Sequence, residues 1–181
     1  YILFFLLVTF QQNASEILLF ADQITYDQKN NIIAKGKAKI FYENNIISSN
    51  LIIYSQTTGD ITLPIEFSLK DERNNYYYGT SGSFESNFEV GKINNVKVLL
   101  EDGSRIVGKE IKRDHKIDIV SKGVYSPCNS KIKIANFLCP VWQLESEKML
   151  HDYETLFLYQ KHSKMRVFNL PVFYTPYLLT P

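Results

Sequence analysis

Residues 34–42, AKGKAKIFY, decide the fold of this chain. Lysines occupy every second position through residue 39, while alanine, glycine, isoleucine and tyrosine take the positions between them and beyond. Successive side chains of a β-strand point to opposite faces. The alternation therefore predicts a strand with one solvated face and one covered face.

The same period of two runs through residues 47–54 and 94–100. Clusters of Asn, Asp and Gly, such as residues 57–60 and 101–104, separate these segments and favour turns. No middle segment keeps the i, i+3, i+4, i+7 stripe of a long helix. We therefore predict an all-β chain, for which a sandwich, a barrel, a jelly roll and a stacked solenoid all remain possible.

Small residues on the covered face, Ala34, Gly36 and Ala38, leave two possibilities open for the interior. The space between the sheets can hold an apolar ligand, or large side chains from the opposite sheet can fill it.

Composition limits the possible functions. The chain has 181 residues, enough for one domain with a sizeable core, and 45% of them are hydrophobic. Twelve Tyr and twelve Phe favour strands. The formal net charge is +1 and there is no long basic run, so we expect no nucleic-acid partner.

The first residues indicate export. Residues 1–10, YILFFLLVTF, form an apolar block that is too short to span a bilayer but fits the h-region of a signal peptide. We expect residues 1–15 to be the remnant of such a peptide; an apolar first strand of the fold is the alternative.

Residues that could carry enzyme chemistry form no convincing site. The histidines His151 and His162 do not follow a zinc-site spacing relative to Cys128 and Cys139. A nucleophile built from Cys139, His151 and Asp152 lacks the glycine-flanked turn of known families. We expect no enzyme activity, no metal and no cofactor. In an oxidising compartment the two cysteines can bridge each other, pair with cysteines elsewhere or remain thiols.

Residues 169–181, NLPVFYTPYLLTP, are apolar and aromatic, contain prolines and carry no charge. Termini of soluble domains are usually polar. Proline lacks the donor of a β-ladder and is confined to edges, strand starts and bulges. We therefore expect this run to lie where a soluble domain meets a membrane.

Several motifs occur along the chain: 21–27 (ADQITYD) with 34–38, 123–128 (GVYSPC), 139–144 (CPVWQL), 151–152 (HD) and 171–181 (PVFYTPYLLTP). Together they resemble the family of the outer-membrane lipopolysaccharide-assembly protein LptD, also called organic solvent tolerance protein. The resemblance covers roughly residues 20–181. The opening repeat, which related periplasmic carriers share, is less specific than the cysteine, tryptophan and proline–tyrosine motifs.

This resemblance implies a periplasmic jelly roll over residues 16–165, an open, taco-like arrangement of antiparallel strands. Residues 166–181 would then be the hinge and first strand of an outer-membrane β-barrel. Cys128 and Cys139 would pair with cysteines near the end of that barrel, although a local bridge between them stays open. The implied hinge residues are Pro171, Tyr174, Pro176, Tyr177 and Pro181.

The resemblance also implies a function in lipopolysaccharide transport and assembly at the outer membrane of a Gram-negative bacterium, with this portion mainly periplasmic. A periplasmic LptA-like carrier would deliver lipopolysaccharide by strand addition, for which we expect the strand containing Ile24 to be the free edge. The plug lipoprotein LptE would occupy the barrel. Acyl chains would contact the covered faces, at Ile24, Tyr26, Ile40, Tyr42, Ile53, Phe67, Val98 and Ile106.

Two other functions remain open. One is a soluble or tethered periplasmic lipopolysaccharide carrier or bridge protein. The other is a structural β-solenoid with a filled core and no lipid path.

Overall fold

The computed structural model describes residues 17–86, 88–127, 131–134, 137–155 and 157–180. All regular secondary structure in these ranges is β-strand. None of the described residues belongs to a helix long and apolar enough to cross a membrane. The strands are β1 (Ile17–Phe20), β2 (Gln23–Tyr26), β3 (Asn31–Tyr42), β4 (Asn45–Ser55), β5 (Ile61–Leu63), β6 (Phe67–Lys70), β7 (Tyr76–Gly79), β8 (Ser81–Phe84), β9 (Val90–Leu99), β10 (Arg105–Asp114), β11 (Ile117–Ser126), β12 (Lys131–Ile134), β13 (Phe137–Pro140), β14 (Trp142–Asp152), β15 (Leu158–Val167) and β16 (Leu170–Thr180).

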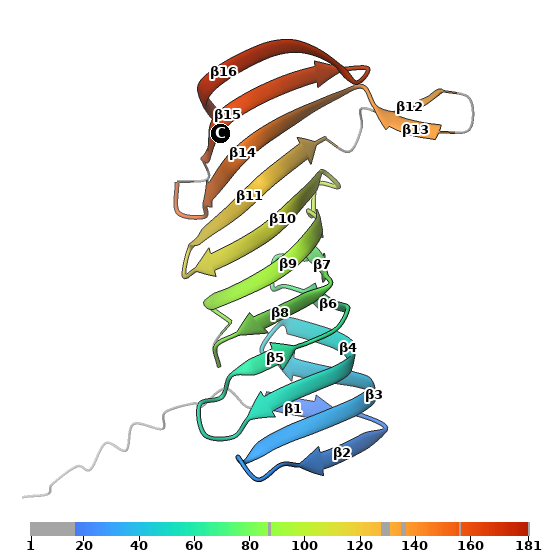
Figure 1. The fold of residues 1–181 in the computed structure, drawn as a ribbon, viewed down its shortest axis with the longest axis vertical. Coiled ribbons are helices and arrows are strands. Elements are labelled where there is room, and N and C mark those ends of the chain that lie inside the picture. The colour runs from blue at the N-terminus through green and yellow to red at the C-terminus, as the bar shows by residue number, and fades with distance from the viewer. Residues whose placement is uncertain (1–16, 87, 128–130, 135–136, 156, 181) are drawn as a thin grey trace, which may run out of the picture.

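Fourteen of these strands form one sheet, in the order β1-β3-β4-β5-β8-β9-β10-β11-β14-β15-β16, with β2, β6 and β7 as additional partners (Figure 1). The strands β12 and β13 form a separate hairpin. The predicted all-β fold of antiparallel strands is confirmed. The first barrel strand stays a prediction: residue 166 lies inside β15, and β16 pairs with β15 in the same sheet. The expected signal peptide, Cys128 and Pro181 lie outside the described residues.

The sheet is folded lengthwise into two arms. Its long strands pair with different short strands at their two ends: β4 pairs with β6 and β5, and β9 pairs with β7 and β8. The strand β3 divides in the same way between β1 and β2. We call the half that contains β1, β6 and β7 the first arm, and the half that contains β2, β5 and β8 the second arm. In Figure 1, β6 and β7 lie behind β8 and β9.

The line between the two arms crosses the long strands near their middle, and we call it the fold line. Buried positions within one arm are two apart, but across the fold line they are three apart in β9, at Ile93 and Val96, and four apart in β3, at Ala34 and Ala38. The extra residue on the outside of the corner bends the strand as a β-bulge does. Residues with left-handed backbone along this line are Lys37, Asn95, Lys122 and His162, with φ between 45° and 51°.

This change of phase corrects one sequence-based assignment. Alternation from Ile47 predicts that Ile53 faces inward, but the fold line crosses β4 between them, near Asn50. The buried residue beyond the fold line is therefore Ile52, which has no exposed surface, and Ile53 lies on the outer face.

Small residues line the inside of the fold line, where the two arms come closest together. A Cβ atom on Gly108 would lie 2.4 Å from Val120 Cγ1, and one on Gly123 would lie 2.8 Å from Met149 Sδ. Glycine at these positions lets the inner surfaces of the arms touch. The small side chain of Ala38 is also fully buried there.

Substitution of Gly108 by Ala should therefore destabilise the fold, because the new methyl group meets the branched side chain of Val120. Overpacking of this kind costs about 1–3 kcal/mol. Urea unfolding of Gly108→Ala and of Val107→Ala measures the effect, the second being an exposed outer-face control. Equal unfolding midpoints for the two variants would show that the corner is not tightly packed.

Candidate functional site

A continuous row of inward-facing apolar side chains runs along the first arm. Directly opposite residues of antiparallel strands share a face of the sheet, so the register assigns the row. We call it the apolar row. In order from β1 to β16 its members are Leu19, Ile40, Ile47, Leu69, Tyr77, Val98, Ile106, Tyr125, Leu144, Met165 and Phe173.

Exposure along the apolar row rises toward β16. Ile40 has no exposed surface and Tyr77 has 1%, whereas Ile106 and Leu144 have 9% each. Phe173, on the last strand, is 56% exposed. The apolar row therefore starts at half-buried Leu19, passes through a closed core and ends on a surface that solvent reaches.

The closed part of the interior is filled by side chains. Between the arms, a cavity lined by residues that include Leu69, Tyr77 and Phe84 has a volume of only about 10 Å³, close to that of one water-sized probe. Of the two possibilities that the sequence left open, packed side chains are what the structure shows at this level. An acyl chain reaches the closed part only if the arms separate.

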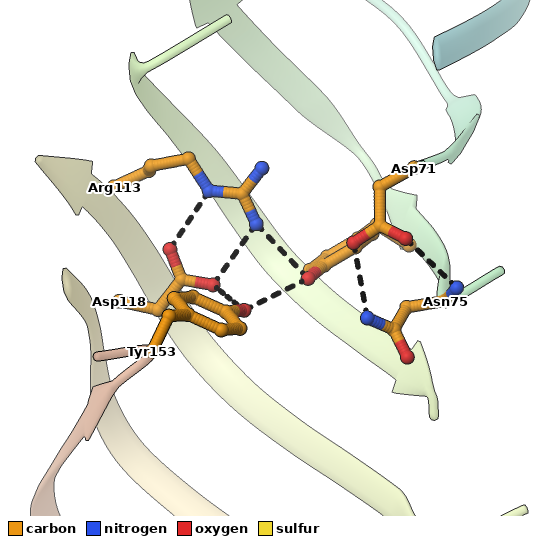
Figure 2. Close-up of polar contacts among 6 residues, drawn as sticks. Asp71, Asn75, Arg113, Asp118 and Tyr153 are labelled. Carbon is orange, nitrogen blue, oxygen red and sulfur yellow. Dashed lines mark hydrogen bonds and ion pairs between the residues drawn. The ribbon is translucent and has the colours of Figure 1, made fainter. Parts of the chain in front are cut away.

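A cluster of polar side chains joins the two arms across this interior, and we call it the clasp (Figure 2). Arg113 of the second arm donates from Nε and Nη2 to the two carboxylate oxygens of Asp118, at 2.9 and 3.0 Å. The same Nη2 lies 3.0 Å from the hydroxyl of Tyr77, which belongs to the first arm. The hydroxyl of Tyr153 donates to Asp118 Oδ2 at 2.6 Å and lies 3.3 Å from that of Tyr77.

Burial and charge set the protonation of the clasp. Burial raises the pKa of Tyr77 to about 12, and it also raises the pKa of Tyr153. Burial alone would lower the pKa of Arg113, but the adjacent Asp118 carboxylate outweighs it and raises that pKa above its ordinary value. The clasp is therefore an ion pair with two neutral phenols at neutral pH, and each of its side chains finds a partner in low-dielectric surroundings.

Further contacts between the arms flank the clasp. The guanidinium of Arg73, in the turn after β6, lies 4.0 Å from the ring centroid of Tyr153, a cation–π contact. The rings of Tyr42 and Phe88 stack with centroids 5.4 Å apart. The clasp and these contacts join the two arms on the side opposite the fold line, from β3 as far as the turn after β14.

The inner face at β14 and β15 also carries a buried polar group. The hydroxyl of Ser146 donates to Gln160 Oε1 at 2.8 Å and lies 2.8 Å from the hydroxyl of Ser163. Gln160 Nε2 has no hydrogen-bond partner among the described residues, although the residue is only 3% exposed. A free amide donor therefore lies on the inner face, directly opposite Met149 and Leu178.

The predicted lipid-lining residues fall into three groups. Four of them, Ile40, Phe67, Val98 and Ile106, are buried on the inner face. Ile24, Tyr26 and Tyr42 share that face: Ile24 lies opposite Ala34 and is 43% exposed at the sheet edge, Tyr26 lies opposite Ile32, and Tyr42 packs against the core. Ile53 is on the outer face, as described above. Contact with lipid stays a prediction for the inward-facing residues.

Within the described residues, the sheet ends at β1 and β2 on one side and at β16 on the other. The strand β2, which contains Ile24, pairs there with β3 alone, as expected for an edge strand. The strand β16 pairs there with β15 alone and exposes Leu170, Phe173 and Tyr177. The predicted hinge residues Pro171, Tyr174, Pro176 and Tyr177 all lie on this strand.

Sequence reasoning missed the clasp, although part of the signal was present. In β10, alternation from Ile111 places Arg113 on the inner face, and in β11 alternation from Val120 does the same for Asp118. A buried Arg and a buried Asp on adjacent strands predict an ion pair. The participation of Tyr77 and Tyr153 depends on the approach of the two arms, which no local pattern reveals. Among the described residues, no three His, Cys, Asp or Glu side chains gather where they could hold a metal ion.

Comparison with solved structures gives a partial similarity. No protein-family profile and no curated protein matches the chain. A crystal structure of LptH, the LptA homologous periplasmic component of the lipopolysaccharide transport device from Pseudomonas aeruginosa, is similar to part of it. The TM-score is 0.47 and the sequence identity is 17%, over 56% of this chain and 77% of the LptH chain.

Loss of the Asp118 carboxylate should destabilise the fold strongly, because Arg113, whose side chain is only 16% exposed, then lacks its counter-charge. Removal of one partner from a buried ion pair costs about 3–5 kcal/mol. Denaturant unfolding of Asp118→Asn tests this expectation, with Asp114→Asn as the matched control, since Asp114 is exposed on the adjacent strand. A loss of less than about 1 kcal/mol in Asp118→Asn would mean that the clasp contributes little to stability.

Alkaline pH should weaken the clasp. The pKa of Tyr77 is about 12 in the folded chain, against the ordinary value of 10.0. A raised phenol pKa means that the stability it contributes is complete below about pH 10 and is lost as the pH rises toward 12, by up to about 3 kcal/mol for this residue. Urea unfolding between pH 9 and 12, compared with Tyr77→Phe/Tyr153→Phe, measures the loss. The double variant should show a shallower decline, and an identical decline would contradict the assignment.

Proposed function

We propose that this chain is a lipopolysaccharide-transport module that holds acyl chains against its inner face. The observation that carries the proposal is the apolar row, because no charged side chain interrupts it from the buried core to exposed Phe173 and its tyrosines contribute their rings to it. Each CH₂ group that leaves water gains roughly 0.8 kcal/mol. A bare apolar surface of this kind holds acyl chains without recognising their detailed structure.

Binding would begin at the β14–β16 end. There the inner face is open, and Leu144, Met165 and Phe173 lie side by side in directly opposite register. The buried N–H groups of Gln160 can donate to an acyl-ester carbonyl or hydroxyl once the two arms separate at this level. Passage further along the apolar row requires the clasp to open. Neither binding nor passage makes or breaks a bond of the lipid, so we infer that the chain is not an enzyme.

Two versions of this function differ in what the module is attached to. In the first, which the cysteine, tryptophan and proline–tyrosine motifs support, the chain is the periplasmic part of an LptD-like outer-membrane protein, and β16 leads toward the barrel and its LptE plug. In the second, it is a periplasmic carrier or bridge protein. The second fits the described strands at least as well, because a folded sheet with free edges and an apolar interior is all that a carrier needs.

Both versions use the sheet edges for assembly. The edge formed by β1 and β2 is free to accept the last strand of an LptA-like partner, because unpaired backbone groups of an edge strand readily extend a sheet. Fractionation of the complete protein separates the two versions: the LptD-like protein stays with the outer membrane after osmotic shock, and the carrier is released.

Lipopolysaccharide should crosslink to the inner face and not to the outer face. A photo-reactive phenylalanine analogue at Phe173 samples the open end of the apolar row, and the same analogue at Val107 is the control. Val107 lies in the same arm on the outer face and has similar exposure, 48% against 56%. After irradiation with lipopolysaccharide, we expect a lipid-positive band from position 173 only, and its loss with deacylated lipopolysaccharide.

One specific observation favours a second candidate function. The filled interior between β3 and β11 is what a purely structural β-module requires, since such a module needs no path for a ligand. The absence of a lipid band from both positions, in chains that circular dichroism shows to be folded, would support this structural function and overturn the transport proposal.

A further inference from the structure

The outer face of strands β14, β15 and β16 is basic and aromatic, unlike the apolar interior of the sheet. Its cross-strand pairs combine lysine and tyrosine: Lys148 lies opposite Lys161, Lys161 opposite Tyr177, and Lys164 opposite Tyr174. Tyr159 lies two residues before Lys161, on the same side of β15. We call Lys148, Lys161, Lys164, Tyr159, Tyr174 and Tyr177 the basic–aromatic face.

Two lysines of this face are placed where folding alone does not favour them. Lys148 and Lys161 are directly opposite each other and both are exposed. Like charges in directly opposite positions destabilise a sheet. Among the ion pairs of the described residues, none includes either lysine.

The neighbouring carboxylates are fewer than the cations around them. Glu145 lies directly opposite Lys164, and its Oε1 lies 2.8 Å from Arg166 Nε. Glu147 Oε2 lies 4.0 Å from Nε2 of His162, a side chain that is charged only when it is protonated. These two carboxylates therefore lie among four cations, Lys148, Lys161, Lys164 and Arg166. The lysines keep a local excess of positive charge on a chain whose overall charge is only +1.

The tyrosines add an exposed aromatic surface to this charge. Tyr177, Tyr174 and Tyr159 are 73%, 53% and 43% exposed. Tyr174 is held in place by its hydroxyl, which lies 2.8 Å from His162 Nδ1. Tyrosine rings have an apolar body and a polar tip, and they prefer the boundary between lipid headgroups and hydrocarbon.

We propose that the basic–aromatic face binds the surface of a membrane that is rich in anionic phospholipid. The lysine ammonium groups neutralise headgroup phosphates, and the tyrosine rings enter the headgroup layer beside them. Charge complementarity selects this occupant, because an uncharged apolar partner leaves the Lys148–Lys161 repulsion in place. The face lies at one end of the described sheet, on β14, β15 and β16, so the other described strands do not keep a flat surface from reaching it. The proposal does not depend on lipopolysaccharide binding inside the sheet.

Vesicle sedimentation of the complete 181-residue chain tests the proposal. Binding is measured to vesicles of phosphatidylcholine alone and to equimolar phosphatidylcholine and phosphatidylglycerol, with no lipopolysaccharide present. The test variant is Lys148→Gln/Lys161→Gln. The matched control is Lys35→Gln/Lys39→Gln, which removes the same charge from two exposed lysines of β3. Every variant keeps residues 1–16, so their contribution to binding is the same throughout.

We expect the wild-type chain to prefer anionic vesicles and Lys148→Gln/Lys161→Gln to bind them roughly 30-fold more weakly, from about 1 kcal/mol per lysine near an anionic surface. The control should retain nearly all of its binding, and Tyr177→Ser should also bind more weakly. Equal losses in the two double variants, equal wild-type binding to both kinds of vesicle, or no binding to either would each overturn the proposal. Because the assay contains no lipopolysaccharide, its outcome is separate from that of the crosslinking experiment.

Discussion

The bend that the long strands share at the fold line is the constraint on which the rest of the structure depends. A flat sheet with one apolar face would leave that face in water, because no helix among the described residues covers it. Extra residues where the long strands cross the fold line turn the sheet back on itself, so that the apolar face of each arm covers the other. Glycine and alanine on the inside of the corner allow this close approach, and polar or charged residues occupy the outside, where the backbone becomes left-handed at positions such as Lys37 and Asn95.

The folded sheet also has to be held closed on its free side, and the structure uses polar contacts for this purpose. A buried ion pair seldom adds much stability compared with apolar residues of the same size. The clasp joins side chains that only one relative placement of the arms brings together, Tyr77 from the first arm and Arg113 from the second. All the contacts of the clasp need the same relative placement of the two arms, so they break together when that placement is lost. A contact of that nature would suit the proposed opening of the interior better than continuous apolar packing does.

The β14–β16 end combines two surfaces of opposite chemistry on a single layer of strands. The inner face presents Leu144, Met165 and Phe173, whereas the outer face presents lysines with tyrosines between them. This contrast follows from the period of two: residues 173 and 174 are neighbours in the chain, yet one side chain faces inward and the other outward. An acyl chain on the inside and a lipid headgroup layer on the outside would place this end of the module between a lipid cargo and a membrane.

The sequence by itself determined the strands and their faces wherever alternation was uninterrupted. The pattern around Ala34 and Ile40 predicted the inward positions of β3, and the strand containing Ile24 was correctly expected at an edge. Alternation is a local property, since it follows from the geometry of consecutive residues. Only the tertiary structure decided where the alternation changes phase, which is why Ile52 and not Ile53 is buried. It also decided that the interior is filled near Tyr77 and open near Phe173, because packing depends on which side chains the two arms bring together over long distances in the sequence.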